Sequence, residues 1–157
     1  MSADASHSSQ LRRADPADAP AIADLFLASR GAAMPWLPVL HGREATVAFF
    51  RDVVPARAEV WLETTAGGEL VGFIAFGGSE VEHLYVAPDR QRQGTGSRLL
   101  TLAQSRGEPL ELWVFRRNAL AQAFYLRHGF RPVRETDGAD NEEREPDVRY
   151  RWEPPPG

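Results

Sequence analysis

The sequence predicts a mixed α/β fold, with a mostly antiparallel sheet of about six to seven strands and about four helices. Two segments of alternating apolar residues, 58–64 and 69–76, flank a short glycine-containing turn, which indicates an antiparallel hairpin. The segment 80–115 then reads as strand, helix and strand, and such a crossover joins parallel strands. A chain of 157 residues, 43% of them hydrophobic, is long enough for one continuous core.

The N-terminal part is expected to form a short strand and a helix. The strand covers 11–14, and Asp15 followed by Pro16 is typical of an N-cap and a first helical position. Gly31 is expected to end this helix. Its buried face consists of residues at helical spacing, namely Ile22, Leu25 and Phe26.

The rest of the chain continues with a proline-punctuated aromatic loop at 34–42 and a helix at 43–53, which turns Val47 and Phe50 inward. Gly129 suits a left-handed helix cap. The elements after the hairpin are expected in the order strand, helix, strand, helix, strand and strand, at 80–86, 95–106, 111–115, 118–128, 130–135 and 147–152.

The two ends of the chain lack such patterns. Residues 1–10 are expected to be a disordered N-terminal tail, 11–152 a single domain, and 153–157 a C-terminal tail. The N-terminus has no apolar signal region, and no apolar run approaches the roughly 20 residues that span a bilayer. A cytoplasmic protein is therefore expected.

The composition excludes several functions. The chain has no cysteine, which excludes disulfides, thiolate metal sites and a cysteine nucleophile, and no metal site is expected. All 18 basic residues are arginine, so P-loop and Schiff-base lysines are excluded too. The net charge of −4 argues against wholesale binding to nucleic acid, and nothing indicates a membrane. The oligomeric state is not decided, and a homodimer stays open.

The most informative stretch is VEHLYVAPDRQRQGTGSRLL, residues 81–100. Gly94 and Gly96 stand where a buried strand turns into a helix, and glycines there let backbone N–H groups approach a ligand. The helix N-terminus adds unpaired donors and a positive dipole end, which favour an anion. Arg90 and Arg92, with Arg98 as a third candidate, add mobile positive charge. A phosphate-bearing ligand is expected, although such glycines also serve turn geometry alone.

The identity of that ligand follows from a resemblance. A Walker A site needs a lysine, and Leu99 stands where the dinucleotide fingerprint needs its third glycine. The remaining pattern, QxxGxG at 91–96 after a strand ending in LYVAP, resembles motif A of the GNAT superfamily of N-acetyltransferases. The segment RRNALAQAFYLRHGF, 116–130, resembles the downstream helix of that family at the same spacing. The resemblance covers 11–152 in element order and is specific at 81–130, and it implies a GNAT-like sheet.

The resemblance implies acetyl-CoA (coenzyme A) as the cofactor, with its pyrophosphate on the glycine turn. The pantetheine arm would pair with the strand 80–86 where this strand splays from 111–115, placing a main-chain N–H near the thioester oxygen. Asn118 would contact the cofactor, although it also suits the N-cap of its helix. The residues assigned to the cofactor in this way are Leu84, Val86, Gln91, Arg92, Gln93, Gly94, Thr95, Gly96 and Asn118.

The resemblance also implies direct attack of an amine on the thioester, with no covalent enzyme intermediate. Tyr125 matches the tyrosine that protonates the leaving thiolate, although an amphipathic tyrosine there could simply pack its ring. Glu80 and Glu82 are the candidate bases, and period two along a strand places both on the face of Leu84 and Val86. The simpler alternative is two solvent-exposed charges at the start of a strand.

The acceptor is expected to be a primary amine of a small molecule or a peptide, entering opposite the cofactor. The acidic segment 137–146 would attract a cationic amine, unless it is only a solvated turn. His83 points to the opposite face of its strand and is expected to be structural. The residues expected to line the acceptor site lie in the aromatic loop: Met34, Trp36 and Leu37.

The sequence thus predicts an N-acetyltransferase that moves the acetyl group of acetyl-CoA directly to an amine. One alternative is a catalytically inactive CoA-binding or regulatory module of the same fold. Another is an interaction domain that uses its glycines only for turns.

Overall fold

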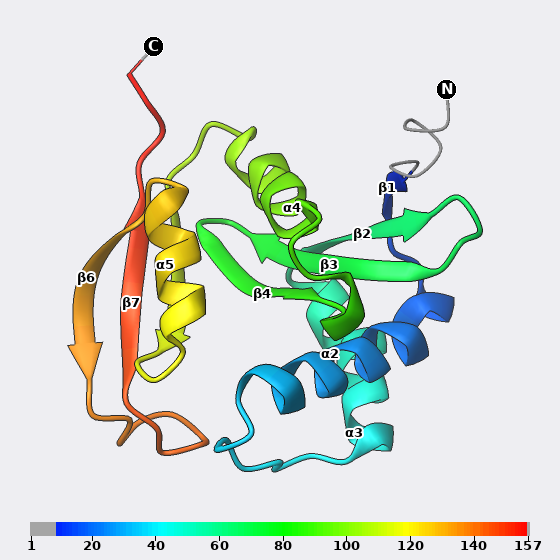
Figure 1. Ribbon diagram of the computed structural model, residues 1–157, viewed down its shortest axis with the longest axis horizontal. Coiled ribbons are helices and arrows are strands. Elements are labelled where there is room, and N and C mark those ends of the chain that lie inside the picture. Colours follow the sequence, from blue (N-terminus) through cyan, green and yellow to red (C-terminus); the bar gives the residue numbers. More distant parts are fainter. Residues whose placement is uncertain (1–8, 157) are drawn as a thin grey trace.

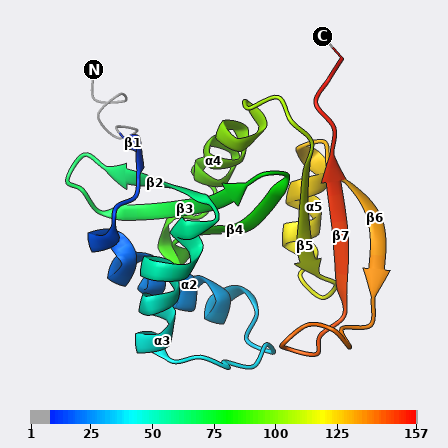
Figure 2. The ribbon, with the colours of Figure 1, turned by 180° about the vertical axis from the view of Figure 1, so that it is seen from behind.

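A computed structural model describes residues 9–156, which contain a seven-stranded sheet (Figures 1 and 2). The strand order is β1-β2-β3-β4-β5-β7-β6, and neighbours are antiparallel except for the parallel pair β4 and β5. The predicted mixed sheet with a central crossover is therefore confirmed. The strands are β1 Ser9–Arg13, β2 Glu59–Thr65, β3 Leu70–Gly77, β4 Glu80–Val86, β5 Leu110–Phe115, β6 Arg131–Thr136 and β7 Asp147–Trp152.

The first strand begins earlier than predicted. Ser9 and Gln10 pair with Thr65 and Thr64 of β2, so they belong to the sheet and not to a tail. Residues 1–8 of the predicted tail lie outside the described residues, as does Gly157. Residues 153–156 follow β7 without regular structure.

The described chain contains four α-helices, as predicted, and several short helical turns. The α-helices are α2 Ala19–Ala33, α3 Arg43–Ala48, α4 Thr95–Gln104 and α5 Ala119–Arg127. The turns are η1 Pro16–Asp18, η2 Phe49–Val53, η3 Val54–Ala56 and η4 Pro88–Arg90. Within residues 9–156, no helix combines the length and the apolar character that crossing a bilayer requires.

The helix after β1 starts as predicted but ends later. Asp15 and Asp18 form a capping box over η1, with each side chain bonded to the backbone at the other position. The prediction that Gly31 ends the helix is wrong. Gly31 has no positive φ, and the helical pattern continues until the Met34 N–H donates to the Arg30 carbonyl at 2.7 Å.

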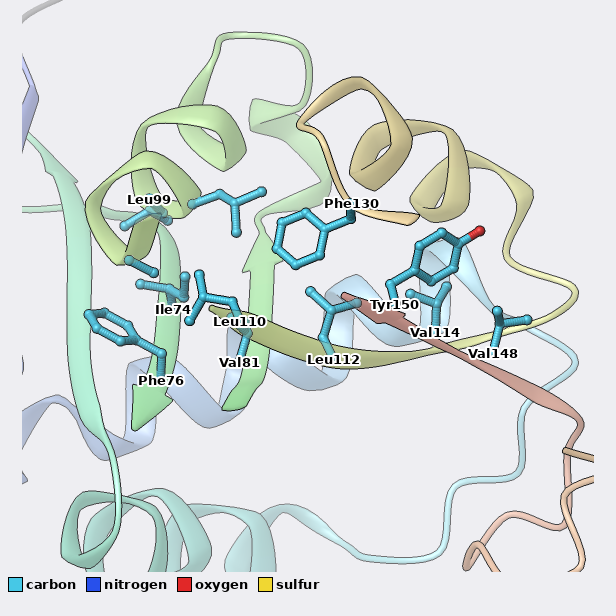
Figure 3. Packing of buried hydrophobic residues seen from close by; sticks show 12 residues of the cluster. Ile74, Phe76, Val81, Leu99, Leu110, Leu112, Val114, Phe130, Val148 and Tyr150 are labelled. Carbon is cyan, nitrogen blue, oxygen red and sulfur yellow. The ribbon is translucent and has the colours of Figure 1, made fainter. Parts of the chain in front are cut away.

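Helices cover both faces of the sheet, and each face has its own core. On one face Ile22 of α2 and Phe50 of η2 pack against Phe73 of β3. On the other face Leu99 of α4 packs with Ile74 of β3, and the same core extends under α5 along β5 and β7 (Figure 3). Consecutive residues of β3 thus serve opposite cores, because side chains alternate along a strand.

A register shift between β3 and β4 changes which side chains share a face. Phe76 pairs with Val81, but the residue before it pairs with His83, so Glu82 is an extra residue on β4. Val81 and Leu84 consequently face the same core although they are three residues apart. The prediction that Glu82 shares a face with Leu84 and Val86 is wrong, because it assumed a strand without a bulge.

Candidate active site

The sheet opens between its two parallel strands. β4 and β5 form one bridge, between Glu80 and Glu111, and are unpaired beyond it. The N–H of Ala87, just after β4, donates to β3 at 2.8 Å. Since hydrogen bonding alternates along an antiparallel pair, the backbone groups of Leu84 and Val86 point away from β3 and into the opening.

The glycine turn before α4 lies at this opening. A glycine is needed at each of its two positions for a different structural reason. Gly94 is the N-cap of α4 with a φ of 84°, and no side chain caps the helix. A Cβ on Gly96 would lie 3.3 Å from Cζ of Phe124 and 3.8 Å from Cγ2 of Val86. The first N–H groups of α4 are therefore available to an anion that approaches the turn closely.

The three arginines of the turn differ in their freedom. Arg98 donates from Nε and Nη2 to the buried Glu63 carboxylate of β2 at 2.7 and 2.8 Å. Arg90 forms an ion pair with Glu69. Arg92 is exposed, has a φ of 65° and has no ion-pair partner within residues 9–156. The prediction of mobile charge is thus wrong for Arg98 and for Arg90, and Arg92 is the arginine of the turn that has no ion pair in the described part of the chain.

A cavity of about 800 Å³ lies between β4, the start of α4, α5 and the end of α2. All the residues that the sequence assigned to the cofactor line this cavity except Gln93, which is exposed. Further lining residues are Ser29, Ala32, Ala33, Met34, Tyr85, Pro88, Arg90, Ser97, Leu120, Ala121, Phe124, Tyr125 and Arg127.

Two of the predicted residues also hold the walls of this cavity in place. The Asn118 side chain accepts the Ala121 N–H at 3.2 Å, so Asn118 caps α5 and lines the cavity at once. The Gln91 side chain donates to the Val86 carbonyl at 2.9 Å. This bond ties the glycine turn to the open edge of β4.

Several residues of α5 that line the cavity were not predicted from the sequence. Leu120, Phe124 and Arg127 are spaced by four and three residues, which places them on one helix face toward the cavity. This spacing was readable from the sequence. The contribution of α2, from Ser29 to Met34, was not readable because it depends on how that helix lies across β4.

Tyr125 of α5 borders the cavity beside the opening in the sheet. Its ring packs against Phe124 and Phe130, with ring centroids 5.2 and 5.5 Å apart. Burial raises the pKa of the Tyr125 phenol well above its usual value, and negative charge on Tyr85 would raise that pKa further. Within the described residues no group hydrogen-bonds to the Tyr125 hydroxyl, so it is a protonated donor available to a ligand.

A second cavity, of about 420 Å³, is bounded by α2, the loop after it, α3, β4, β5 and the β6–β7 loop. Met34 and Leu37, two of the three residues expected at the acceptor site, line this cavity. Within the described residues, Met34 and Tyr85 are the two that line both cavities, so the cavities meet there. The other lining residues are Phe26, Leu27, Arg30, Gly31, Pro38, Val39, Leu40, His41, Ala45, Thr46, Phe49, Glu82, His83, Trp113, Phe115, Glu142 and Glu143.

Trp36, the third residue predicted for the acceptor, does not line this cavity. Its ring packs edge-on against Phe115 with centroids 6.2 Å apart, and the Arg117 guanidinium lies 4.1 Å from the ring centroid. Arg117 also pairs with Glu145 at 2.8 Å. Trp36 therefore anchors the aromatic loop to β5 and to the acidic loop.

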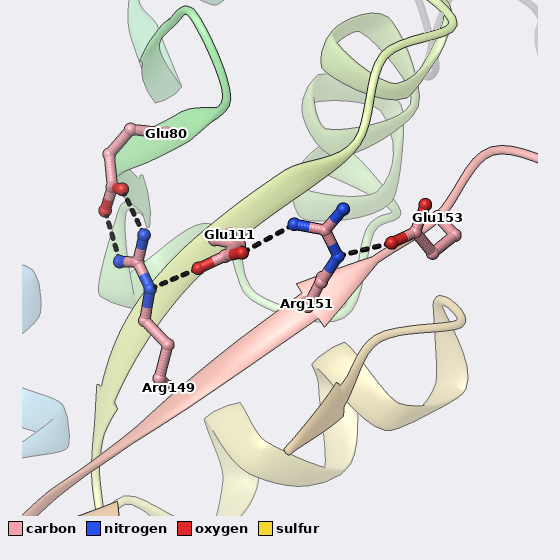
Figure 4. Close-up of polar contacts among 5 residues, drawn as sticks. All are labelled: Glu80, Glu111, Arg149, Arg151 and Glu153. Carbon is pink, nitrogen blue, oxygen red and sulfur yellow. Dashed lines mark hydrogen bonds and ion pairs between the residues drawn. The ribbon is translucent and has the colours of Figure 1, made fainter. Parts of the chain in front are cut away.

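The two candidate bases occupy different surroundings. Glu82 lines the second cavity, and Arg57 holds its carboxylate at 2.9 Å. Glu80 lines neither cavity. Both of its oxygens accept from Arg149 at 2.8 and 2.6 Å, at the end of a ladder that continues through Glu111, Arg151 and Glu153 (Figure 4).

The acidic loop between β6 and β7 contributes two carboxylates to the second cavity. Glu143 lies 3.4 Å from Arg30 of α2, and Glu142 lies 3.0 Å from the His41 ring. The loop is ordered by its own contacts, among them the bond from the Asn141 side chain to the Glu145 carbonyl at 2.7 Å. It is therefore part of a cavity wall rather than only a solvated turn.

His83 is packed among aromatic rings on the α2 side of β4, as expected for a structural residue. Phe50 lies 5.2 Å away between ring centroids, and Phe26 and Phe49 each lie 5.7 Å away. Burial lowers the pKa of His83 to about 3, helped by the charges of Arg30 and Arg57. The imidazole is therefore neutral and supplies no proton near neutral pH.

The chain is similar in sequence to known proteins. Residues 56–132 match the family model of the acetyltransferase (GNAT) domain. The peptidyl-lysine N-acetyltransferase YiaC of Escherichia coli (strain K12) is 32% identical over 124 residues, which cover 78% of this chain and 84% of YiaC.

Solved structures share the fold. Apo YjaB from Escherichia coli has a TM-score of 0.76 at 22% identity, over 92% of this chain and 97% of that one. PaiA N-acetyltransferase from Thermoplasma acidophilum, solved in complex with coenzyme A, has a TM-score of 0.72 at 20% identity, over 93% and 99%.

Proposed function

The chain belongs to the GNAT family of acetyltransferases, and from this premise we propose that it transfers the acetyl group of acetyl-CoA directly to a primary amine. The observation that carries the proposal is the meeting of two cavities at Met34 and at Tyr85 of β4, the strand that borders the opening in the sheet. One cavity has anion-binding backbone groups, and the other has carboxylates. A thioester and an amine entering from opposite sides would meet at this point.

The first cavity fits the cofactor by its chemistry. The uncapped N-terminus of α4 supplies backbone N–H groups for the pyrophosphate, and Gly96 allows the close approach that this requires. Arg92 adds a free positive charge. Leu84 and Val86 offer backbone groups to the pantetheine amides, and a backbone N–H there would stabilise negative charge on the thioester oxygen.

Tyr125 is the proposed proton donor to the sulfur. Its raised pKa keeps the phenol protonated, but also makes full proton transfer to a thiolate, whose conjugate acid has a pKa of about 8.5, uphill. Tyr125 would therefore act mainly as a hydrogen-bond donor as the thiolate leaves. Its contribution should lie at the lower end of the usual range for general acids, about 100-fold.

Glu82 is the proposed base for the amine, acting directly or through water. It is the carboxylate of β4 that faces the acceptor cavity, whereas Glu80 is held by both terminal nitrogens of Arg149 outside that cavity. A base is needed because an alkylammonium with a pKa near 10.4 is only about one part in 10³ neutral near pH 7.4.

A peptide side chain is the acceptor class that the surroundings favour. The relative YiaC is named a peptidyl-lysine N-acetyltransferase. In this chain the cavity lining includes Val39, Leu40 and Trp113, which are 80%, 46% and 42% exposed and could contact a peptide around the inserted amine. Glu142 and Glu143 would attract its positive charge.

Loss of the Tyr125 hydroxyl tests the proposal. With acetyl-CoA and a lysine-containing peptide, thiol release should fall about 100-fold in Tyr125→Phe while the affinity for CoA is retained. Tyr150→Phe is the matched control, because the Tyr150 hydroxyl bonds to Gln122 and lines neither cavity.

The unmodified protein separates the alternatives. A melting temperature that rises with CoA, without thiol release toward any amine, would indicate an inactive CoA-binding module. If the melting temperature did not rise at millimolar CoA, an interaction domain would be the remaining alternative, and the proposal would be refuted.

A further inference from the structure

The contact between the two cavities consists of two side chains. Met34 and Tyr85 are the residues among 9–156 that line both the cofactor cavity and the acceptor cavity. Met34 comes from the end of α2 and Tyr85 from β4, so they reach the contact from different elements. They form a partition between the cavity of about 800 Å³ and the cavity of about 420 Å³.

Met34 is fixed in this partition by its backbone and its burial. Its N–H donates to the Arg30 carbonyl at 2.7 Å, and its own carbonyl accepts the Leu37 N–H at 3.0 Å. The residue is only 4% exposed. A methionine is flexible by itself, but these constraints leave its side chain little room to swing away.

Tyr85 is fixed by its ring and by the charges near its hydroxyl. The ring packs edge-on against Phe26 with centroids 5.0 Å apart, and lies 6.0 Å from Phe73 of the core. The Arg30 guanidinium and the Glu143 carboxylate are both close enough to act on the phenol, in opposite directions. The partition is therefore made of two packed side chains, and the two cavities meet beside them.

The acyl group must end at this partition if the proposed function holds. Backbone groups of Leu84 and Val86 lead the cofactor arm along β4, on either side of Tyr85 in sequence. Tyr125 borders the same cavity from α5, so the Tyr85 and Tyr125 side chains line one cavity from different elements. The amine enters from the opposite cavity, so the alkyl tail of the acyl group has to fit beside Met34 and Tyr85.

We propose that Met34 and Tyr85 set the length of the acyl group that the protein accepts, with acetyl fitting and longer chains excluded. This inference rests on the proposed function and adds its acyl specificity. A tail longer than one methyl would have to displace two packed side chains or occupy the space of the amine. Each added methylene should lower kcat/KM about 10-fold or more, as in other pockets that exclude a methylene.

The test compares acetyl-, propionyl- and butyryl-CoA with one amine in the full-length protein. Met34→Ala should raise the ratio of kcat/KM for butyryl-CoA to that for acetyl-CoA by about 10-fold or more. Because both values of kcat/KM are measured with the same amine, their ratio cancels any effect of the Met34 substitution on amine binding. Leu37→Ala removes a similar volume from the acceptor cavity alone, and Tyr85→Phe keeps the ring, so both should leave the ratio within about twofold.

A binding measurement keeps this inference separate from the proposed function. The dissociation constants of CoA, acetyl-CoA and butyryl-CoA are measured by calorimetry without any amine. Met34→Ala should bind CoA as the unmodified protein does, which shows that it is folded, and should tighten only butyryl-CoA.

If the unmodified protein bound and used butyryl-CoA as well as acetyl-CoA, the proposal that Met34 and Tyr85 limit the acyl length would be wrong. A Met34→Ala variant that binds CoA normally with unchanged ratios would overturn it as well. If no amine accepts an acetyl group, the proposed function fails, and the ratio of dissociation constants still decides this inference.

Discussion

Removing the charge of Glu63 is the perturbation whose effect the structure defines best. Glu63 lies on β2 and is only 2% exposed. Its carboxylate accepts from Thr95 Oγ1 at 2.6 Å and from Nε and Nη2 of Arg98 at 2.7 and 2.8 Å. These bonds connect the sheet to the first turn of α4, the turn that we propose holds the pyrophosphate.

The size of the effect depends on what each substitution leaves unpaired. Glu63→Ala leaves the Thr95 hydroxyl, 1% exposed, with only a weak contact to Arg98, at a cost of about 1–3 kcal/mol. Arg98 is 46% exposed and regains water, so the lost ion pair adds only about 1 kcal/mol. Glu63→Gln keeps the shape and a partner for Thr95, and should lower the free energy of unfolding by about 1–2 kcal/mol.

The pH dependence of this cost has a definite sign. Burial acts to raise the pKa of Glu63, but the bonds from Arg98 and Thr95 outweigh it, and the pKa lies below the ordinary 4.5. The unfolded chain therefore takes up this proton at a higher pH than the folded one. The stability from Glu63 is fully present above pH 4.5 and is lost as the pH falls through the lower pKa of the folded state.

Urea unfolding followed by tryptophan fluorescence at pH 7.5 and near pH 4 measures both quantities. Glu59→Gln on the same strand is the matched control, because Glu59 is 36% exposed and its removal should cost less than about 1 kcal/mol. Equal costs for the two variants, or a cost of Glu63→Gln that does not shrink in acid, would show that the buried ion pair does not stabilise the fold in this way.

Two further predictions concern β4. His83 stays neutral in the folded protein down to a pH of about 3, so the unfolded chain binds more protons below pH 6.5, and stability falls by up to about 1.4 kcal/mol per pH unit there. Urea titrations should show a weaker pH dependence in His83→Phe, and an unchanged dependence would contradict the burial argument. Glu82→Gln should lower kcat/KM for the amine about 100-fold near pH 7.4, whereas Glu80→Gln should change it far less; the reverse order in an initial-rate assay would exchange their roles.

Local sequence signals predicted most of the elements. Asp15 and Pro16 marked the helix start, because a capping side chain and a proline act on their own turn. The glycine turn was also predicted from local residues, because glycines between a strand and a helix let the backbone approach a ligand, and Gly94 indeed adopts a positive φ. Gly31 led to a wrong helix end, because a glycine of this kind ends a helix when it adopts a positive φ, and Gly31 does not.

The remaining differences between prediction and structure have a common cause, which is contact between residues that are distant in the chain. Arg98 was expected to be free because Glu63 lies 35 residues away in sequence. Glu82 was placed on the wrong face because a bulge against β3 cannot be read from β4 alone. The position of Trp36 outside the second cavity likewise depends on distant residues, Arg117 and Phe115, and its role at the acceptor stays a prediction.

Residue patterns alone predicted the strand and helix order, the glycine turn at Gly94 and Gly96 that we propose holds the pyrophosphate, and Tyr125 as a candidate acid. These depend on periodicity, on backbone conformation and on a motif within a short segment. The family resemblance had implied that these strands splay, but the packing of the folded chain shows that β4 and β5 separate after Glu80 and that two cavities meet at Met34 and Tyr85. The reason is that a cavity is enclosed by several elements at once, so its walls and its contents follow from packing across the chain and not from any one segment.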